Sequence, residues 1–391
     1  MTGIEDRLRD ALTARAEAVT DDGRSRVLPE PHRPLTRAGW WAPVAVATAI
    51  VLVVGVVVVG TRTRLVTTPR PVSSSGALPP PIRQVWPDAV HEVPTTGPGG
   101  RTFTPEMFVT DGIVVGQGLG KDRFDGLWAY DVVRRRFSLI ASFKEPIGGT
   151  LTFGDGHLAW STARDRMTEV WTVPVTGGTP RRLARFPAAI DDDDNYEGIS
   201  LAVADDAVVW SPPGGGVYRV PLKGGKVSLI EGTKGQWLVE WPWAGWPKRG
   251  TMTDQSVPRP MEHLRNVLSG ESRDAVPPAG HTSWYECGLT WCYDGSSAWR
   301  RDGTGLHAMP GSTGGASFRG RVVLLDQTDR AGNGGRSLYD AATRRAGLLF
   351  AVPVSRNPRD NPPGLFVPKN LFFFKKDKKT LVLVNPNAMI R

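Results

Sequence analysis

Residues 42–60 carry no charged side chain, and valine and alanine fill most of their positions. As a helix, nineteen residues rise about 28 Å, which matches a bilayer core of about 30 Å. About 40 residues precede this run, and no A-x-A-like cleavage site follows it, which favours an uncleaved signal anchor over a cleaved signal peptide. The pattern therefore predicts a transmembrane signal anchor over 41–61, with a tail over 1–40 and a large domain after it.

The tail has a helical pattern of apolar positions. Thr2 and Glu5 fit a capping box, which predicts an amphipathic helix over 3–19. A lone helix of this length cannot bury its apolar face, so we expect that face to contact the membrane or a partner protein. The face consists of Ile4, Leu8, Leu12 and Val19. After the anchor, residues 62–81 are rich in proline, serine and threonine, which is typical of a spacer.

The large domain repeats one strand pattern. An aromatic or apolar strand ends in Asp, Asn or Pro and is followed by a turn, as in LWAYD and VWTVP. A period of about 42 residues with three or four strands per unit predicts the blades of a β-propeller. The strand ends that mark the units are Asp131, Pro174, Pro221, Asn266, Asp302, Asp340 and Asn385.

Further details predict how the ring is built. Three residues before four of the marks stand Trp128, Trp171, Tyr218 and Trp299, which we expect to pack between blades. The last unit stops short of an outer strand, so residues 82–94 are expected to supply it and close the ring. Residues 251–262 look like an insertion in the fourth unit, which leaves both six and seven blades open.

The LWAYD, VWTVPVTGG and VYRVPLKGG units and the CGLTWC hairpin resemble bacterial TolB-like and WD-repeat-like β-propeller proteins tethered by one N-terminal helix. The resemblance covers about residues 82–391. It implies an all-β, seven-bladed or six-bladed propeller that serves as a binding platform.

The cysteines and the net charge indicate a compartment. Cys287 and Cys292 flank a tight turn, and such a pair can form a disulfide across a hairpin, which persists in an oxidising compartment. The net charge of +9 lies entirely after the anchor, because the acidic and basic residues of the tail cancel. A basic domain could favour anionic envelope polymers or acidic ligands, although a solubility bias with no partner is the preferred explanation of the charge. Nucleic acid is not expected as a partner of an exported domain.

Candidate chemistry is sparse. Asp191, Asp192, Asp193 and Asp194 form the densest acidic run, which could hold calcium but lacks the spacing of a calcium loop. The LysLysAspLysLys run at 375–379 predicts a charged hairpin tip, with anionic lipid or polymer as a possible ligand. Asp155, Asp205 and Asp294 recur before second strands, as turn residues or as carboxylates at the axis. There is no G-x-S-x-G or H-E-x-x-H motif, and we expect no catalytic residue and no cofactor.

These patterns together predict a membrane-tethered, extracytoplasmic propeller with its N-terminus in the cytoplasm. Its expected function is non-catalytic binding of an envelope protein or ligand on a propeller face. One alternative is a transmembrane signalling partner whose tail helix binds a cytoplasmic regulator, in the manner of an anti-sigma factor. The other alternative is an envelope hydrolase or lyase with a metal at the axis.

Overall fold

The structure is a computed structural model that describes residues 77–120, 124–143, 147, 151–188, 199–247, 261–281, 284, 286–352, 364–367 and 370–391. Within these residues no helix has the length and apolarity needed to cross a bilayer. The predicted anchor at 41–61, the tail over 1–40 and residues 62–76 of the spacer lie outside the described residues.

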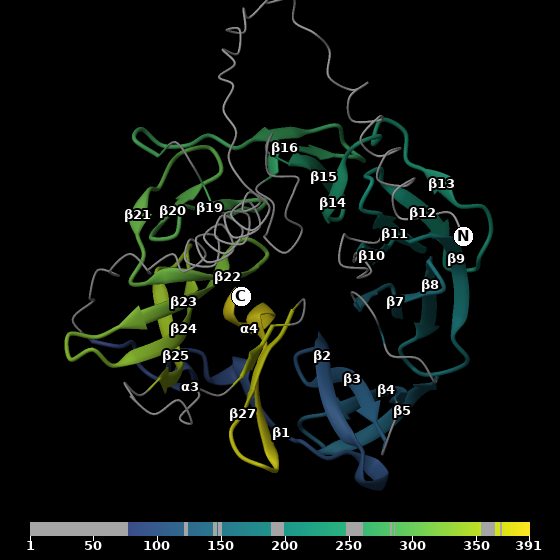
Figure 1. Cartoon of the computed structure of the whole chain (residues 1–391), viewed down its shortest axis with the longest axis horizontal. Coiled ribbons are helices and arrows are strands. Elements are labelled where there is room, and N and C mark those ends of the chain that lie inside the picture. Colours follow the sequence, from purple (N-terminus) through teal and green to yellow (C-terminus); the bar gives the residue numbers. More distant parts are fainter. Residues whose placement is uncertain are drawn as a thin grey trace, which may run out of the picture. The chain divides into compact units, whose positions relative to one another are not determined.

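The described strands form seven antiparallel four-stranded sheets arranged as blades around an axis (Figure 1). From the axis outward, blade 1 consists of β2 (Thr102–Thr110), β3 (Ile113–Leu119), β4 (Phe124–Asp131) and β5 (Arg136–Ser142). Blade 2 consists of β6 (Thr152–Gly154), β7 (His157–Arg164), β8 (Met167–Pro174) and β9 (Arg181–Pro187). Blade 3 consists of β10 (Ser200–Ala204), β11 (Ala207–Ser211), β12 (Tyr218–Pro221) and β13 (Ser228–Leu229).

Blades 4 to 7, in the same order, are β14 (Trp237–Glu240), β15 (Trp243–Pro247), β16 (Met261–Asn266), β17 (Ser272–Asp274); β18 (Glu286–Cys287), β19 (Trp291–Tyr293), β20 (Ser297–Arg300), β21 (His307–Ala308); β22 (Ser312–Phe318), β23 (Val322–Thr328), β24 (Gly334–Asp340), β25 (Arg345–Val352); and β26 (Leu365–Phe366), β27 (Phe372–Lys375), β28 (Thr380–Val384), β1 (Val90–Pro94). The all-β, seven-bladed alternative is therefore correct, and the fourth unit is a blade of its own.

Five of the seven repeat marks are Asp or Asn residues whose side chains bond the backbone just after the third strand. Asp131, Asn266 and Asp340 each accept a hydrogen bond on Oδ1 from the backbone N–H two residues ahead, at 3.0 Å. Asp302 and Asn385 accept the same bond at 3.0 and 3.1 Å. At Asp131, Asn266, Asp302 and Asp340 this side chain shapes the turn by which the chain reverses into the outer strand, whereas Asn385 caps the helical turn Pro386–Met389.

The core lies between blades rather than inside any one of them. The second strands, such as β3 and β11, are buried on both faces, because a blade contacts a neighbour on each side. Each of the seven interfaces contains its own apolar cluster, with one member from each of the two blades being, for example, Phe103 and Phe373, Leu127 and Leu158, Val170 and Leu201, Val209 and Ala244, Ala275 and Trp299, Tyr293 and Leu325, and Leu338 and Phe372.

The ring closes with a strand from the N-terminal side of the propeller. β1 pairs antiparallel with β28 from Val90↔Val384 to Pro94↔Thr380, and the two lie side by side in Figure 1. This is the outer strand expected from residues 82–94, but only its second half is extended. The first half forms two short helical turns, α3 (Ile82–Val85) and the 3-10 turn η1 (Pro87–Ala89), because Ile82 and Trp86 pack into the interface of blades 6 and 7.

Short segments complete the described fold. The 3-10 turn η2 (Pro98–Gly100) connects β1 to β2, and α4 (Pro386–Met389) follows β28 near the axis. Residues 80–81 do not act as spacer: the Leu348 N–H donates to the Pro80 carbonyl at 2.8 Å, and Pro81 forms a parallel bridge with Leu348. The spacer predicted over 62–81 is therefore partly docked on the outer strand of blade 6.

We predict that breaking the closure destabilises the whole propeller. Val93 is 2% exposed in the interface of blades 7 and 1, so Val93→Asp buries a charge and should lower the free energy of unfolding by about 3 kcal/mol or more. Deleting residues 82–94 should cost at least as much. Urea unfolding measures both changes. Glu92→Gln alters an exposed side chain of the same strand and should stay within about 0.5 kcal/mol; an unchanged midpoint for Val93→Asp would contradict closure by β1.

Candidate functional site: a groove between blades 1 and 2

A cavity of about 460 Å³ lies on the face of blade 2 that packs against blade 1, and we call it the blade 1–2 groove. Side chains alternate along a strand, so every second residue of β7 points to this face, and the register places Trp160 beside Trp171 and Thr162 beside Glu169. The groove is lined by Phe143, Trp160, Thr162, Arg164, Asp165, Glu169, Trp171, Pro180, Arg182 and Arg185.

The floor of the groove is aromatic. Trp160 is 2% exposed and stacks on Phe143, the residue that follows β5, with ring centroids 5.5 Å apart and planes inclined by 24°. Trp171 is only half-buried, and its Nε1–H donates to Thr162 Oγ1 at 3.2 Å. That bond fixes the orientation of the indole, whose exposed part forms a preformed apolar platform.

Arginines from β7 and β9 surround this floor. Glu169 Oε1 accepts a hydrogen bond from Arg182 Nη1 at 2.7 Å and lies 3.5 Å from Arg185 Nε, while both guanidinium groups stay about half exposed. Arg164 pairs with Asp165 at 3.3 Å at the tip of the β7–β8 hairpin. The lining holds three arginines and two carboxylates, so its excess charge is positive. A planar guanidinium beside an indole suits a ligand that offers both an anionic group and a flat apolar face.

The axial turns hold two of the three recurring aspartates. Asp155 and Asp205 lie in the turns between first and second strands with φ of 46° and 52°, a left-handed conformation that aspartate tolerates. Asp155 Oδ2 accepts the Asp206 N–H at 3.0 Å, and Asp205 Oδ2 accepts Trp241 Nε1–H at 3.0 Å. Both carboxylates therefore connect neighbouring blades, which is a structural role.

The expectation for Asp294 was wrong. The CGLTWC hairpin is formed by the first and second strands of blade 5, so Asp294 follows the second strand instead of preceding it. It consequently lies in a turn at the opposite end of the blade from Asp155 and Asp205. Its Oδ1 accepts the N–H groups of Ser296 and Ser297, and His281 Nδ1 lies 2.5 Å from Oδ2.

Two half-buried glutamates lie on innermost strands, and no sequence motif marked them. Burial raises the pKa of Glu106 in β2, which accepts a hydrogen bond from Gln117 Nε2 at 2.7 Å. Burial also raises the pKa of Glu286 in β18, which accepts a hydrogen bond from the Ser317 hydroxyl. They belong to blades 1 and 5, and the described residues contain no group of three His, Cys, Asp or Glu that could hold a metal ion.

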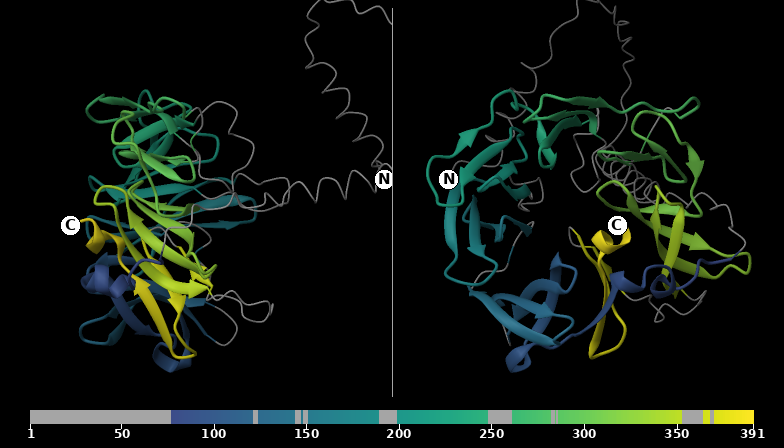
Figure 2. Two further views of the ribbon diagram at one scale, coloured as in Figure 1. Left: turned by 90° about the vertical axis from the view of Figure 1, so that its left-hand side faces the viewer. Right: turned by 180° about the vertical axis from the view of Figure 1, so that it is seen from behind.

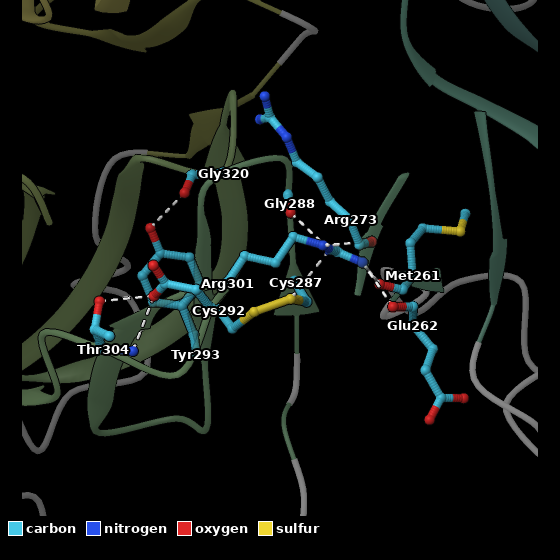
Figure 3. The surroundings of a disulfide bond; sticks show 11 residues. Met261, Glu262, Arg273, Cys287, Gly288, Cys292, Tyr293, Arg301, Thr304 and Gly320 are labelled. Atoms are coloured by element: carbon cyan, nitrogen blue, oxygen red, sulfur yellow. Dashed lines mark hydrogen bonds between the residues drawn. A yellow bond between two sulfur atoms is a disulfide. The ribbon is translucent and has the colours of Figure 1, made fainter. Parts of the chain in front are cut away.

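The cysteine pair belongs to an interface. Cys287 and Cys292 are direct partners in the β18–β19 register and are joined by a disulfide (Figure 3). Beside them, buried Arg301 donates to the carbonyls of Met261 and Glu262 in blade 4, at 2.6 and 2.8 Å, and to that of Gly288 in blade 5 at 2.9 Å. Burial lowers the pKa of Arg301 to about 10, which leaves it charged at neutral pH. The disulfide and Arg301 therefore stabilise the contact between blades 4 and 5.

The sequence predicted only part of this arrangement. Trp299 is fully buried, as expected of a packing residue, but Trp171 combines packing with an exposed platform. The signal that could have located the groove is the arginine-rich RRLARF strand beside two tryptophan-bearing strands. The calcium candidates Asp191, Asp192, Asp193 and Asp194 lie outside the described residues, as does the tail-helix face of Ile4, Leu8, Leu12 and Val19.

No protein-family model and no curated protein matches the chain. Among solved structures it is similar to TolB from Acinetobacter baumannii (12% identity, 62% of this chain and 52% of that chain, TM-score 0.32). It is also similar to YCF48 bound to D1 peptide (10% identity, 76% and 95%, TM-score 0.39) and to oligogalacturonate lyase in complex with manganese (13% identity, 75% and 97%, TM-score 0.35). The match thus spans about half of TolB, and at these TM-scores none of the three assigns a ligand or an activity to this chain.

Two tryptophans of the groove should differ in their effect on stability. Trp160→Ala removes a buried ring from the interface of blades 1 and 2 and should lower the free energy of unfolding by about 3–5 kcal/mol. Trp171→Ala removes a half-exposed ring and should cost roughly 1–2 kcal/mol, because less apolar surface returns to water. Urea unfolding of both variants measures the difference; equal costs would show that Trp171 is a core residue and not a platform.

Proposed function

We propose that this protein is a membrane-tethered, extracytoplasmic β-propeller that binds an envelope protein or ligand in the blade 1–2 groove. The observation that carries the proposal is the pairing of a partly exposed, oriented indole at Trp171 with the half-exposed guanidinium groups of Arg182 and Arg185. Aromatic and arginine side chains in one pocket are the groups that contribute most to binding energy in known interfaces.

The groove is better suited to binding than to catalysis. Its one half-buried carboxylate, Glu169, is engaged by Arg182 and lies beside Arg185, so it holds the arginines in place. A ligand with an anionic group would share these guanidinium donors and stack an apolar face on Trp171. We assign no reaction to the chain.

The proposed cellular location of the propeller rests on two features of the sequence and one of the fold. The uncharged run at 42–60 supplies the expected anchor, and the preceding tail is expected in the cytoplasm. The Cys287–Cys292 disulfide, which belongs to the interface of blades 4 and 5, supports an oxidising compartment for the propeller. This orientation would present the groove to the envelope.

Site-specific photo-cross-linking of the full chain in its native membrane tests the proposal. A photoreactive residue at 164, at the rim of the groove, should capture an envelope component that the same probe at 229 does not capture. Leu229 is the control position because it is 44% exposed on the outer strand of blade 3. Adding Trp171→Ala or Arg182→Ala should reduce capture at 164 about tenfold, as expected when a hot-spot residue is truncated. Identical products at both positions, or capture at 164 that survives both substitutions, would overturn the groove as the binding site.

A further inference from the structure

The chain reaches the propeller from one particular face. Leu78 lies against Gly335, the Pro80 carbonyl bonds Leu348, Ile82 lies against Gly347, and the Val85 carbonyl accepts a hydrogen bond from Arg345. Leu78 therefore lies near the start of β24 and the last residues of β25, whereas Val85 lies near Arg345, the first residue of β25. Leu78, the second described residue, thus lies toward the Val352 end of the blade, where the second and third strands are joined by a hairpin. We call this side of the propeller the linker face.

A basic hairpin lies on the same face. Lys375–Lys379 joins β27 and β28, the second and third strands of blade 7, so its tip is on the linker face by the same topology. The pairing of β1 is consistent with this position of the hairpin tip: β1 runs toward the linker face, from Val90 beside Val384 to Pro94 beside Thr380 at the start of β28. In the edge-on view of Figure 2 the yellow hairpin extends away from the side that carries the C-terminal turn.

The hairpin tip is held by bonds to its own and the neighbouring backbone. The Thr95 N–H donates to the Lys379 carbonyl at 2.9 Å, and the Thr95 hydroxyl donates to the Lys378 carbonyl at 3.0 Å. Asp377 Oδ1 accepts the Lys379 N–H at 2.7 Å, so the single acidic residue of the tip is used to shape the turn. The tip thus presents four exposed lysine side chains in a fixed loop, of which Lys376 also pairs with Glu92 at 3.0 Å.

We propose that this hairpin docks on the anionic headgroups of the bilayer that holds the anchor, and so turns the linker face toward the membrane. The inference rests on the membrane tether of the proposed function. The fifteen residues 62–76 separate the expected anchor from Ala77 and can reach at most about 50 Å when fully extended, so the attachment point on the linker face stays within about that distance of the bilayer. Positive charge meets negative charge there, and each lysine at an anionic surface favours contact by roughly fivefold.

The test uses the full chain in vesicles of phosphatidylcholine that contain a headgroup-attached nitroxide quencher, with or without about 30% phosphatidylglycerol. A fluorophore is placed at the tip through Lys378→Cys, and in a matched control on the opposite face through Val133→Cys. Val133 is 82% exposed in the β4–β5 turn, which joins the third and fourth strands of blade 1. We expect quenching at 378 to rise about threefold or more with phosphatidylglycerol and to return to baseline near 1 M salt, where the Debye length is about 3 Å. Quenching at 133 should not change.

A tip without lysine separates electrostatic docking from mere proximity. Lys375→Gln, Lys376→Gln and Lys379→Gln, combined in the labelled chain, should abolish the dependence on phosphatidylglycerol. If alkaline carbonate extracts the chain from the vesicles, the tether itself is overturned and the docking with it. If the chain is retained but quenching at 378 equals that at 133, or is the same in both lipids, only the docking is overturned. Binding of the tip to soluble dextran sulfate without lipid-dependent quenching would assign the hairpin to a polymer and also overturn it.

Discussion

The fold depends on the fact that no blade of about 42 residues can bury both of its faces alone. A four-stranded sheet that is apolar on both sides needs a neighbour on each side, and only a closed ring provides this for all seven. The consequence is visible in the clusters: each interface has its own apolar core, and residues such as Leu158 and Ala159, adjacent in sequence, serve two different interfaces. Polar groups that are buried, such as Arg301, bond across the same interfaces.

Ring closure also determines on which face of the propeller the segment before β1 and the Lys375–Lys379 hairpin lie. Because β1 must pair with β28, the preceding segment has to cross the outer strand of blade 6 and turn back, which it does through α3 and η1. This path brings the linker and the Lys375–Lys379 hairpin to the same face. The proposed docking is therefore a product of ring closure, whereas the blade 1–2 groove depends on a local arrangement of two neighbouring blades.

Much of the architecture could be predicted from the sequence because its signals are local. The Asp and Asn residues that end third strands bond the backbone two residues ahead in five of the seven blades, and this recurrence reveals the period. The local signal was ambiguous at Asp294, which was expected before the second strand of blade 5 but follows it. The reason is that the spacing of a C-x4-C hairpin is the same whichever two strands of a blade it joins.

The groove could not be predicted with the same success, since it depends on contacts between blades. Phe143 follows the outer strand of blade 1 and meets Trp160 from the second strand of blade 2, and nothing in the sequence around either residue indicates that contact. The charge balance of the groove likewise depends on the β8–β9 register, which aligns Glu169 with Arg185. Half-buried Glu106 and Glu286 could not be predicted as site residues either, because an isolated glutamate in a strand has no motif.

The most direct test of ring closure is to unfold the full chain in urea while two probes report on distant interfaces. Fluorescence from a label at Glu92, beside the β1–β28 pair, reports on the closing blade, and the oxidised Cys287–Cys292 hairpin, followed by hydrogen exchange, reports on blade 5. A ring that is stable only when every interface is formed predicts coincident transitions with one midpoint. Loss of the β1 signal at a lower urea concentration, with blade 5 still protected, would show that the blades are stable without closure and would contradict this view of the fold.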